Sequence, residues 1–120
     1  MKTRESEEMY LETILLLKKK KGQMRSIDIV EELNYAKSSV SRAVNLLQKR
    51  GYIEICPSTG YITLTECGAK RANDIYERHR VITELLIKIG AGESVAEENA
   101  CRIEHVISDE LLETIKEYLK

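Results

Sequence analysis

The sequence lacks the features that mark membrane, secreted or disulfide-stabilised proteins. Its longest apolar runs, such as residues 14–17, are far too short to cross a bilayer. Its first residues carry no apolar secretion signal. The three cysteines are an odd number in a chain without an export signal, which argues against a disulfide framework and for reduced thiols. We therefore expect a cytoplasmic protein with no membrane partner.

Catalytic motifs are also missing from the chain. There is no HExxH run, no glycine-rich loop that could cradle a phosphate and no nucleophile elbow. The two histidines are not paired on one predicted helix, and six glycines offer little for building catalytic loops. The sequence therefore predicts neither an enzyme nor a small-molecule substrate.

What the chain does contain is ordinary globular composition with an uneven distribution of charge. It has 120 residues, of which 42% are hydrophobic and 32% charged, with a net charge of -1. That size allows one modest core or two small lobes. Residues 33–53 contain four bases and no acid, whereas residues 91–120 contain eight acids and three bases. This pattern fits one lobe that meets phosphates and another that attracts cations or pairs with a partner subunit, although two ordinary solvated faces would also produce it.

The order of predicted elements in the first half is that of a winged helix-turn-helix. Helical spacing, capping residues and turn residues predict three helices before two β-prone runs, and a long helix follows. Two short helices joined by a tight turn, then a hairpin and a long helix, define this motif. The expected elements are a first helix ending in the lysines at 18–21 and Gly22, a helix over 27–33 capped by Ser26 and carrying Ile27, Val30 and Leu33 on one face, a helix over about 38–50 closed by Gly51, and a hairpin of 52–56 with 61–64.

The second half is predicted to be entirely helical. A long helix begins at Thr65 and stops at the glycines of residues 90–92. A further helix spans about 93–107, and the last begins after an N-cap at Ser108. We therefore expect a mainly α protein with a small β-hairpin, divided into domains 1–64 and 65–120.

The second helix of the helix-turn-helix offers a polar, acid-free face for the major groove of DNA. Arg42 could make a bidentate contact with guanine and Asn45 with adenine. Small hydroxyl and basic side chains around them suit contacts with phosphates. The phosphate-binding residues expected from this pattern are Lys37, Ser38, Ser39, Lys49 and Arg50.

A second cluster has the spacing of a transition-metal site. Cys101, Glu104 and His105 stand at i, i+3 and i+4, so on a continuous helix they would point one way. Met9 and Glu12 are likewise three residues apart on the first helix and could supply the remaining ligands. Thioether, thiolate and imidazole ligands favour late divalent metals over Mg²⁺ or Ca²⁺, but they do not select one metal.

Residues 8–11 (Glu-Met-Tyr-Leu) together with Cys101-x-x-Glu104-His105 resemble the diphtheria toxin repressor family of iron- and manganese-dependent transcriptional regulators. The resemblance implies a winged-helix domain followed by a helical dimerisation and metal-binding domain. It also implies a homodimer that represses genes by binding a double-stranded DNA operator. Iron-type members carry the Met and Cys found here at Met9 and Cys101, which favours Fe(II), whereas Glu12 matches a carboxylate of the manganese-type branch and leaves a Mn(II) response open. Other late divalent metals are expected to bind in vitro.

The resemblance also implies a possible second metal site and a shortened architecture. His79 stands at a position that the family uses for metal, while Thr83 replaces a carboxylate and Glu97 replaces a histidine of the iron-type members. The chain ends without the SH3-like domain of larger members, so it resembles a short form.

Two alternative functions follow from the same residues. One is a winged-helix regulator without metal control, in which Cys101 is a core or redox-responsive residue. The other is a small metalloenzyme that uses Glu104 as a base beside a metal held by His79 and His105. The missing catalytic motifs argue against the enzyme.

Overall fold

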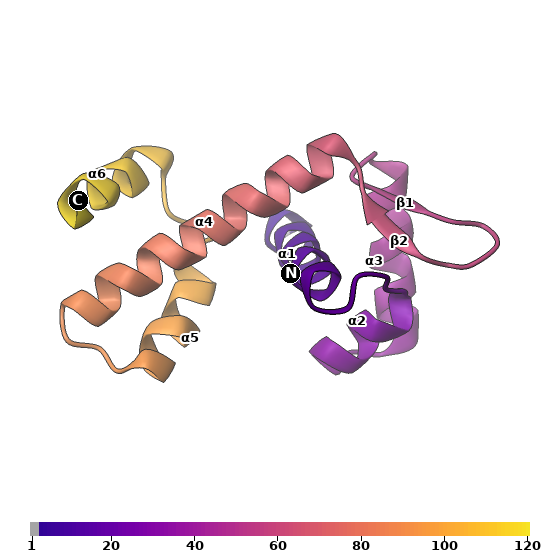
Figure 1. The fold of residues 1–120 in the computed structure, drawn as a ribbon, viewed down its shortest axis with the longest axis horizontal. Helices are drawn as coiled ribbons and strands as arrows, with labels where there is room; N and C mark the ends of the chain where they lie inside the picture. The colour runs from indigo at the N-terminus through magenta and orange to yellow at the C-terminus, as the bar shows by residue number, and fades with distance from the viewer. Residues whose placement is uncertain (1–2) are drawn as a thin grey trace. The chain divides into compact units, whose positions relative to one another are not determined.

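The computed structural model describes residues 3–120, with side chains from residue 6 onward. The mainly helical fold with one small hairpin is confirmed (Figure 1). The chain forms two compact units, Met1–Asn73 and Asp74–Lys120. Among the described residues, no helix is long and apolar enough to cross a membrane. The elements are α1 (Thr3–Lys21), α2 (Ser26–Leu33), α3 (Lys37–Lys49), β1 (Ile53–Ile55), β2 (Ile62–Leu64), α4 (Glu66–Lys88), α5 (Glu93–Ile103) and α6 (Asp109–Leu119).

The core of the first unit is aliphatic. Helix α1 packs on α2 and α3, and α3 packs on β1. Burying these apolar side chains supplies most of the stabilisation at about 25 cal/mol per Å² removed from water. The side chains buried in this core include Leu11, Ile14, Met24, Ile29, Val40, Val44, Leu47, Ile53 and Ile62.

Helix α2 differs from its prediction at both its cap and its face. The N-cap is Arg25 instead of Ser26, and the carboxylate of Asp28 accepts a hydrogen bond from the Arg25 N–H at 2.8 Å. Ile29 is fully buried, whereas Ile27, expected on the buried face, remains 42% exposed. The helix begins one residue earlier than predicted because Asp28 at its third position caps it, which a search for a Ser or Thr cap does not detect.

Helix α3 and the hairpin follow the prediction closely. Val40, Val44 and Leu47 form the buried stripe of α3. The hairpin is antiparallel, with Ile53 opposite Leu64 and Ile55 opposite Ile62. Because each strand has only three residues, the hairpin depends on attachments outside itself.

One such attachment joins the hairpin to the segment before α2. The Ile62 N–H donates to the Met24 carbonyl at 2.9 Å, and the Lys18 ammonium donates to the Ile62 carbonyl at 3.1 Å. The last turn of α1 and the residues before α2 therefore both hold β2. The four lysines that end α1 thus include one with a structural role.

A buried ion cluster joins α1 to the end of α3 and the beginning of α4. The Glu7 carboxylate is almost completely buried and pairs with Arg50 at 2.5 Å and with Arg71 at 3.1 Å. Arg71 also lies 3.6 Å from Glu8 and 5.0 Å from the centre of the Tyr52 ring. Buried carboxylates need such partners because an isolated buried charge costs several kcal/mol.

The second unit has a smaller core and ends α5 earlier than predicted. Val81 of α4 packs with Leu112 and Ile115 of α6. Ser108 caps α6 as predicted, accepting a hydrogen bond from the Leu111 N–H at 3.1 Å. Helix α5 ends at Ile103 instead of at 107, and residues 104–106 form a turn. The division between the compact units falls inside α4, nine residues after the predicted boundary at 64/65.

Replacing Gly68 with alanine should destabilise the first unit. Gly68 lies in the first turn of α4, where an added Cβ would stand 1.9 Å from the Tyr52 carbonyl oxygen. Because that contact is with backbone, relief requires a shift of the hairpin or of α4. We expect Gly68→Ala to cost at least about 2 kcal/mol, comparable to overpacking elsewhere in cores, measured as a lower urea midpoint.

The matched control is Gly92→Ala, because an added Cβ there meets nothing within 4 Å and Gly92 has an ordinary φ of -66°. Because Gly92 is the N-cap of α5 and alanine is a poorer cap than glycine, the change should cost up to about 1 kcal/mol, less than at Gly68. Equal midpoints for the two variants would contradict the close approach at Gly68.

Candidate metal centre and nucleic-acid interface

The most unusual side chain of the second unit is Glu104. It is the C-cap of α5, and its N–H still donates to the Ala100 carbonyl at 2.9 Å. Its side chain is 0% exposed. Neither carboxylate oxygen accepts a hydrogen bond from the described residues. A buried carboxylate without hydrogen bonds is costly unless a cation lies beside it.

Two imidazoles face this carboxylate. His79 Nδ1 of α4 lies 3.4 Å from Glu104 Oε1, and His105 Nε2 lies 4.0 Å from the same oxygen. Both histidine side chains are largely buried, with 21% and 11% exposed. One carboxylate oxygen therefore lies near an imidazole nitrogen from each of two residues. His nitrogen and carboxylate oxygen are both ligand types for Zn²⁺, Fe²⁺ and related ions.

Cys101, Glu104 and His105 have different surroundings in the structure. Cys101 is exposed on α5, Glu104 is buried and His105 lies in the turn after the helix. His79, expected in a separate second site, instead faces Glu104.

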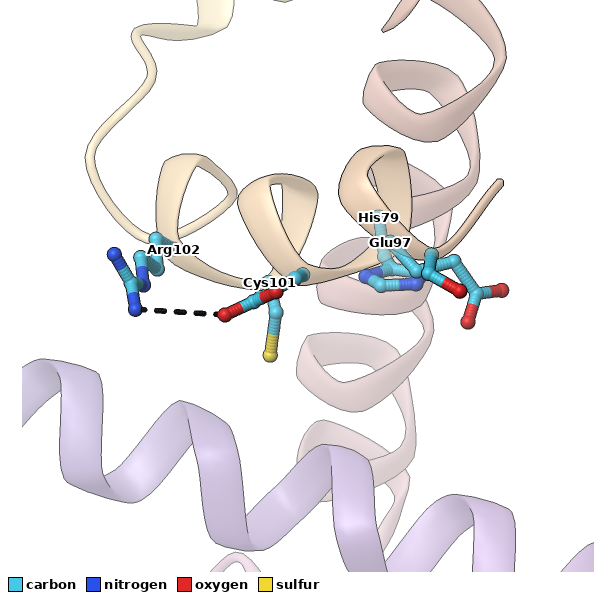
Figure 2. A pocket seen from close by; sticks show the side chains of 6 residues that line it. His79, Glu97, Cys101 and Arg102 are labelled. Carbon is cyan, nitrogen blue, oxygen red and sulfur yellow. Dashed lines mark ion pairs between the residues drawn. The ribbon is translucent and has the colours of Figure 1, made fainter. Parts of the chain in front are cut away.

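Cys101 borders an open depression of about 580 Å³, which His79 and Glu97 also line. Figure 2 shows Cys101 and Glu97 on α5 and His79 behind them on α4. Arg102 pairs with Glu98 at 3.8 Å at the rim, marked by the dashed line. His79 thus borders both the depression with Cys101 and Glu97 and the buried carboxylate of Glu104.

Arg78 fixes the turn that carries Glu104 and His105. Its guanidinium donates to the Glu104 carbonyl at 3.3 Å and to the Asp109 carboxylate at 2.6 Å. The sequence analysis did not identify Arg78, because its partners lie 26 and 31 residues away and no spacing rule links them. Thr83, one turn further along α4, has a buried hydroxyl with no hydrogen-bond partner among the described residues.

The two predicted ligands of the first unit lie one turn apart on α1. Met9 and Glu12 are both half-buried. The Tyr35 hydroxyl donates to the Met9 sulfur at 3.5 Å, and the Thr13 hydroxyl donates to the Met9 carbonyl at 2.8 Å. Tyr35 belongs to the turn between α2 and α3. The Met9 sulfur is therefore in contact with the turn of the helix-turn-helix, a link that the sequence analysis missed.

Helix α3 presents the predicted polar face. Its N-cap is Ala36, and the helix starts at Lys37 with no acid in its first turn. Arg50, which was expected to bind phosphate, has a partner within the protein, because its guanidinium pairs with the Glu7 carboxylate. Ser39 is half-buried, and the side chains exposed on α3 include those of Lys37, Ser38, Arg42, Asn45 and Lys49.

The wing loop between β1 and β2 carries an acidic thiol. The Cys56 sulfur lies 3.3 Å from the Ser58 hydroxyl. Hydrogen bonds from the side chains of Ser58 and Thr59, and then from their backbone, lower the pKa of Cys56 to about 6. Cys56 is exposed, so its thiolate is accessible at neutral pH.

The helix-turn-helix, the hairpin wing and the buried histidine-carboxylate cluster define a class of protein: a winged-helix transcriptional regulator that responds to metal. Comparison with known proteins supports this class and narrows it. Residues 2–61 match the family model described as the iron dependent repressor N-terminal DNA binding domain. Residues 65–120 match the iron dependent repressor metal binding and dimerisation domain. The chain therefore belongs to the iron-dependent repressor family, which confirms the resemblance.

The relatives are transcriptional regulators, not enzymes. The chain is 36% identical over 118 residues to an uncharacterized HTH-type transcriptional regulator, MJ0568, of Methanocaldococcus jannaschii, covering 97% of this chain and 94% of that one. It is 30% identical over 107 residues to the transcriptional regulator MntR of Escherichia coli O6:H1, covering 89% of this chain and 68% of that one.

A solved structure agrees with the fold. The structure of the manganese regulator SloR superposes with a TM-score of 0.82 at 24% identity over 94% of this chain. The chain spans about half of SloR, 53% of its length. The winged-helix architecture is thereby confirmed.

The acidic thiol gives a pH prediction for the wing. Below about pH 6 the Cys56 sulfur is protonated and unreactive, and above it the thiolate attacks alkylating reagents. Iodoacetamide labelling of Cys56, followed by peptide mass spectrometry, should therefore reach half its maximal rate near pH 6. Ser58→Ala removes the largest stabilising hydrogen bond and should move that midpoint upward. An unchanged midpoint in Ser58→Ala would show that Ser58 does not hold the thiolate.

Proposed function

We propose that this chain is an Fe(II)-activated repressor that binds a double-stranded DNA operator as a homodimer. The observation that carries the metal part is the buried Glu104 carboxylate, which accepts no hydrogen bond among the described residues and faces His79 and His105. A bound divalent cation supplies the positive charge that this carboxylate otherwise lacks.

The proposed ligands of the second unit are Glu104, His79 and His105, which offer oxygen and nitrogen, and Cys101, which offers a thiolate. Met9 and Glu12 of α1 are proposed as metal ligands of the first unit. The thioether of Met9 and the thiolate of Cys101 are soft ligands that favour Fe(II) over Mn(II). Glu97 is proposed as a weaker, ancillary ligand beside His79, because both line the depression next to Cys101.

Mn(II) is the second candidate metal. The converging set at Glu104 contains only oxygen and nitrogen donors, and Cys101 lies on the exposed side of α5. Without the thiolate, this set suits Mn(II) as well as Fe(II). SloR, whose fold this chain shares, is a manganese regulator, which adds manganese as a metal to test here. By the Irving-Williams order, Co²⁺, Ni²⁺ and Zn²⁺ should also bind in vitro.

The chain's own contacts suggest how metal could affect DNA binding. The hydroxyl of Tyr35, in the turn before α3, donates a hydrogen bond to the Met9 sulfur. A movement of Met9 would therefore displace Tyr35 and, with it, the start of the recognition helix. The Glu7 carboxylate, two residues before Met9 on α1, pairs with Arg50, the C-cap residue of α3. Helix α1 therefore contacts both ends of α3, and ordering α1 would order the recognition helix.

On DNA, we propose that α3 enters the major groove. Arg42 and Asn45 are exposed on its polar face and suit guanine and adenine respectively. Lys37, Ser38, Ser39 and Lys49 would contact phosphates and fix the register. Arg50 pairs with Glu7 and is proposed as a further phosphate ligand.

The homodimer is proposed to form through the second unit. Several large apolar side chains there are more than half exposed, which is a common sign of a protein interface when they gather on one face. The family model for this part describes a dimerisation domain. The exposed apolar residues are Ile89 at 67%, Val95 at 55%, Val106 at 67%, Leu111 at 51% and Tyr118 at 59%.

Glu104→Gln tests the metal centre. The amide keeps the size of the side chain but loses the charge that binds metal. We expect affinity for Fe(II) and Mn(II), measured anaerobically by calorimetry, to fall by about 100-fold, since even outer partners of metal ligands contribute 10–100-fold. Glu110→Gln, an exposed acid of α6, is the control and should bind metal normally. Full metal affinity in Glu104→Gln would contradict the proposed centre.

DNA anisotropy with Fe(II), Mn(II) or chelator tests the regulatory part. A fragment from upstream of the protein's own gene should bind more tightly with metal, and chelator should reverse the effect. Tighter binding with Fe(II) than with Mn(II) at equal occupancy would support the iron assignment, and the opposite ranking would replace it with manganese. Binding that ignores both metals would support the alternative of a metal-independent regulator.

Arg42→Ala tests the recognition helix separately. Removing a bidentate base contact should weaken operator binding by about 1–3 kcal/mol, roughly 5- to 150-fold, while metal affinity stays unchanged. Lys120→Ala removes the same charge from the end of the chain, where the Lys120 ammonium pairs with Glu117 at 2.9 Å. It should leave operator binding unaltered. Equal losses in the two variants would indicate a general charge effect instead of base recognition.

A further inference from the structure

The tip of the wing, residues 57–61, has no charge of its own. These five residues, which follow Cys56, contain no acidic or basic side chain. A cation nevertheless lies against the tip, because Arg25 reaches it from the N-cap of α2. The sequence analysis gave Arg25 no role, because Thr59 lies 34 positions further along the chain and no local pattern links the two residues.

Arg25 contacts three consecutive residues of the tip. Its Nε donates to the Thr59 carbonyl at 2.8 Å, and its guanidinium lies 4.6 Å from the centre of the Tyr61 ring. Gly60, with φ of +78°, lies so close that a Cβ there would stand 3.8 Å from the Arg25 Cδ. A charge-assisted hydrogen bond and a cation-π contact therefore act on the same short segment.

Arg25 is itself held in place by α1 and α2. The Asp28 carboxylate accepts from the Arg25 N–H at 2.8 Å and from the Lys21 ammonium at 2.6 Å. The Lys21 side chain first, and then the Arg25 N–H, hold the pKa of Asp28 below its usual value, so the carboxylate is charged at neutral pH. The guanidinium thus extends from a fixed backbone to the tip of the wing.

The wing needs such a support. Strands of three residues form a marginal hairpin, and ordering a free loop upon binding costs about 1–2 kcal/mol per residue. The Ile62 N–H and carbonyl anchor the first residue of β2, next to the tip, through Met24 and Lys18. Within the loop, the Gly60 N–H donates to the Cys56 carbonyl at 2.8 Å and the Cys56 N–H donates to the Tyr61 carbonyl at 2.9 Å. Arg25 adds a side-chain contact from outside the hairpin to residues 59–61.

We propose that Arg25 is the positioning residue of the wing: it preorders the uncharged tip for DNA by acting through Thr59 and Tyr61. This inference rests on the proposed DNA binding. Its competing explanation is that Arg25 contacts a DNA phosphate directly. The two differ in a measurable way, because a lost phosphate contact lowers the slope of log K against log salt by about one, whereas a loosened wing does not.

The experiment compares Arg25→Ala with Tyr61→Leu, which removes the aromatic partner without changing charge. Hydrogen exchange of the protein alone should show the amides of Gly60 and Tyr61 exchanging about three- to tenfold faster in both variants, as expected for losing a contact of this strength. Operator affinity should fall by a similar factor in both, with the salt slope unchanged. Lys20→Ala, which removes a nearby exposed charge of α1, should leave the exchange of both amides unaltered.

Two results would overturn the inference. One is unchanged exchange at residues 60 and 61 in both variants. The other is a salt slope that falls by about one in Arg25→Ala alone, which would make Arg25 a phosphate ligand. Failure of the unaltered protein to bind any operator would instead count against the proposed function, and the exchange measurement, made without DNA, would still decide whether Arg25 orders the wing.

Discussion

The burial of carboxylates is the constraint on which both units of this protein depend. A buried carboxylate must meet positive charge or hydrogen-bond donors, and the two units meet this need differently. Glu7 is surrounded by the guanidinium groups of Arg50 and Arg71, which stay charged at any physiological pH. Glu104 instead faces His79 and His105, whose ring nitrogens can bind a metal ion.

The ion pairs of Glu7 therefore form without a ligand, whereas the Glu104 cluster is proposed to depend on a bound metal ion. The Glu7 cluster ties α1 to the end of α3 and the start of α4 without any ligand, so it belongs to the scaffold of the DNA-binding unit. The Glu104 cluster combines a buried carboxylate with two imidazoles, and a bound cation would balance the negative charge of the carboxylate. In the proposed function, the Glu7 cluster holds α3 against α1, and a cation bound at the Glu104 cluster is the metal signal.

Much of the fold could be predicted from local patterns. The buried stripe of Val40, Val44 and Leu47 has helical spacing, and Ser108 is an ordinary N-cap. The end of α5 could not be predicted, because the segment through 107 keeps helical spacing and no glycine or proline stops it. Arg78, which holds the Glu104 carbonyl and Asp109, fixes that turn from 26 and 31 residues away. Local sequence patterns cannot reveal contacts between residues so far apart in the chain.

The sequence by itself determined the family and the chemistry available to it: residues 8–11 with the Cys101, Glu104 and His105 spacing, and the acid-free stretch that becomes α3. Tertiary structure decided which of those groups meet. It placed His79 against Glu104, left Cys101 exposed, and gave Tyr35, Arg25 and Arg50 partners on other elements. The physical reason is that residue type and spacing fix what a side chain can donate or accept, whereas burial and distance arise only once separate elements pack together.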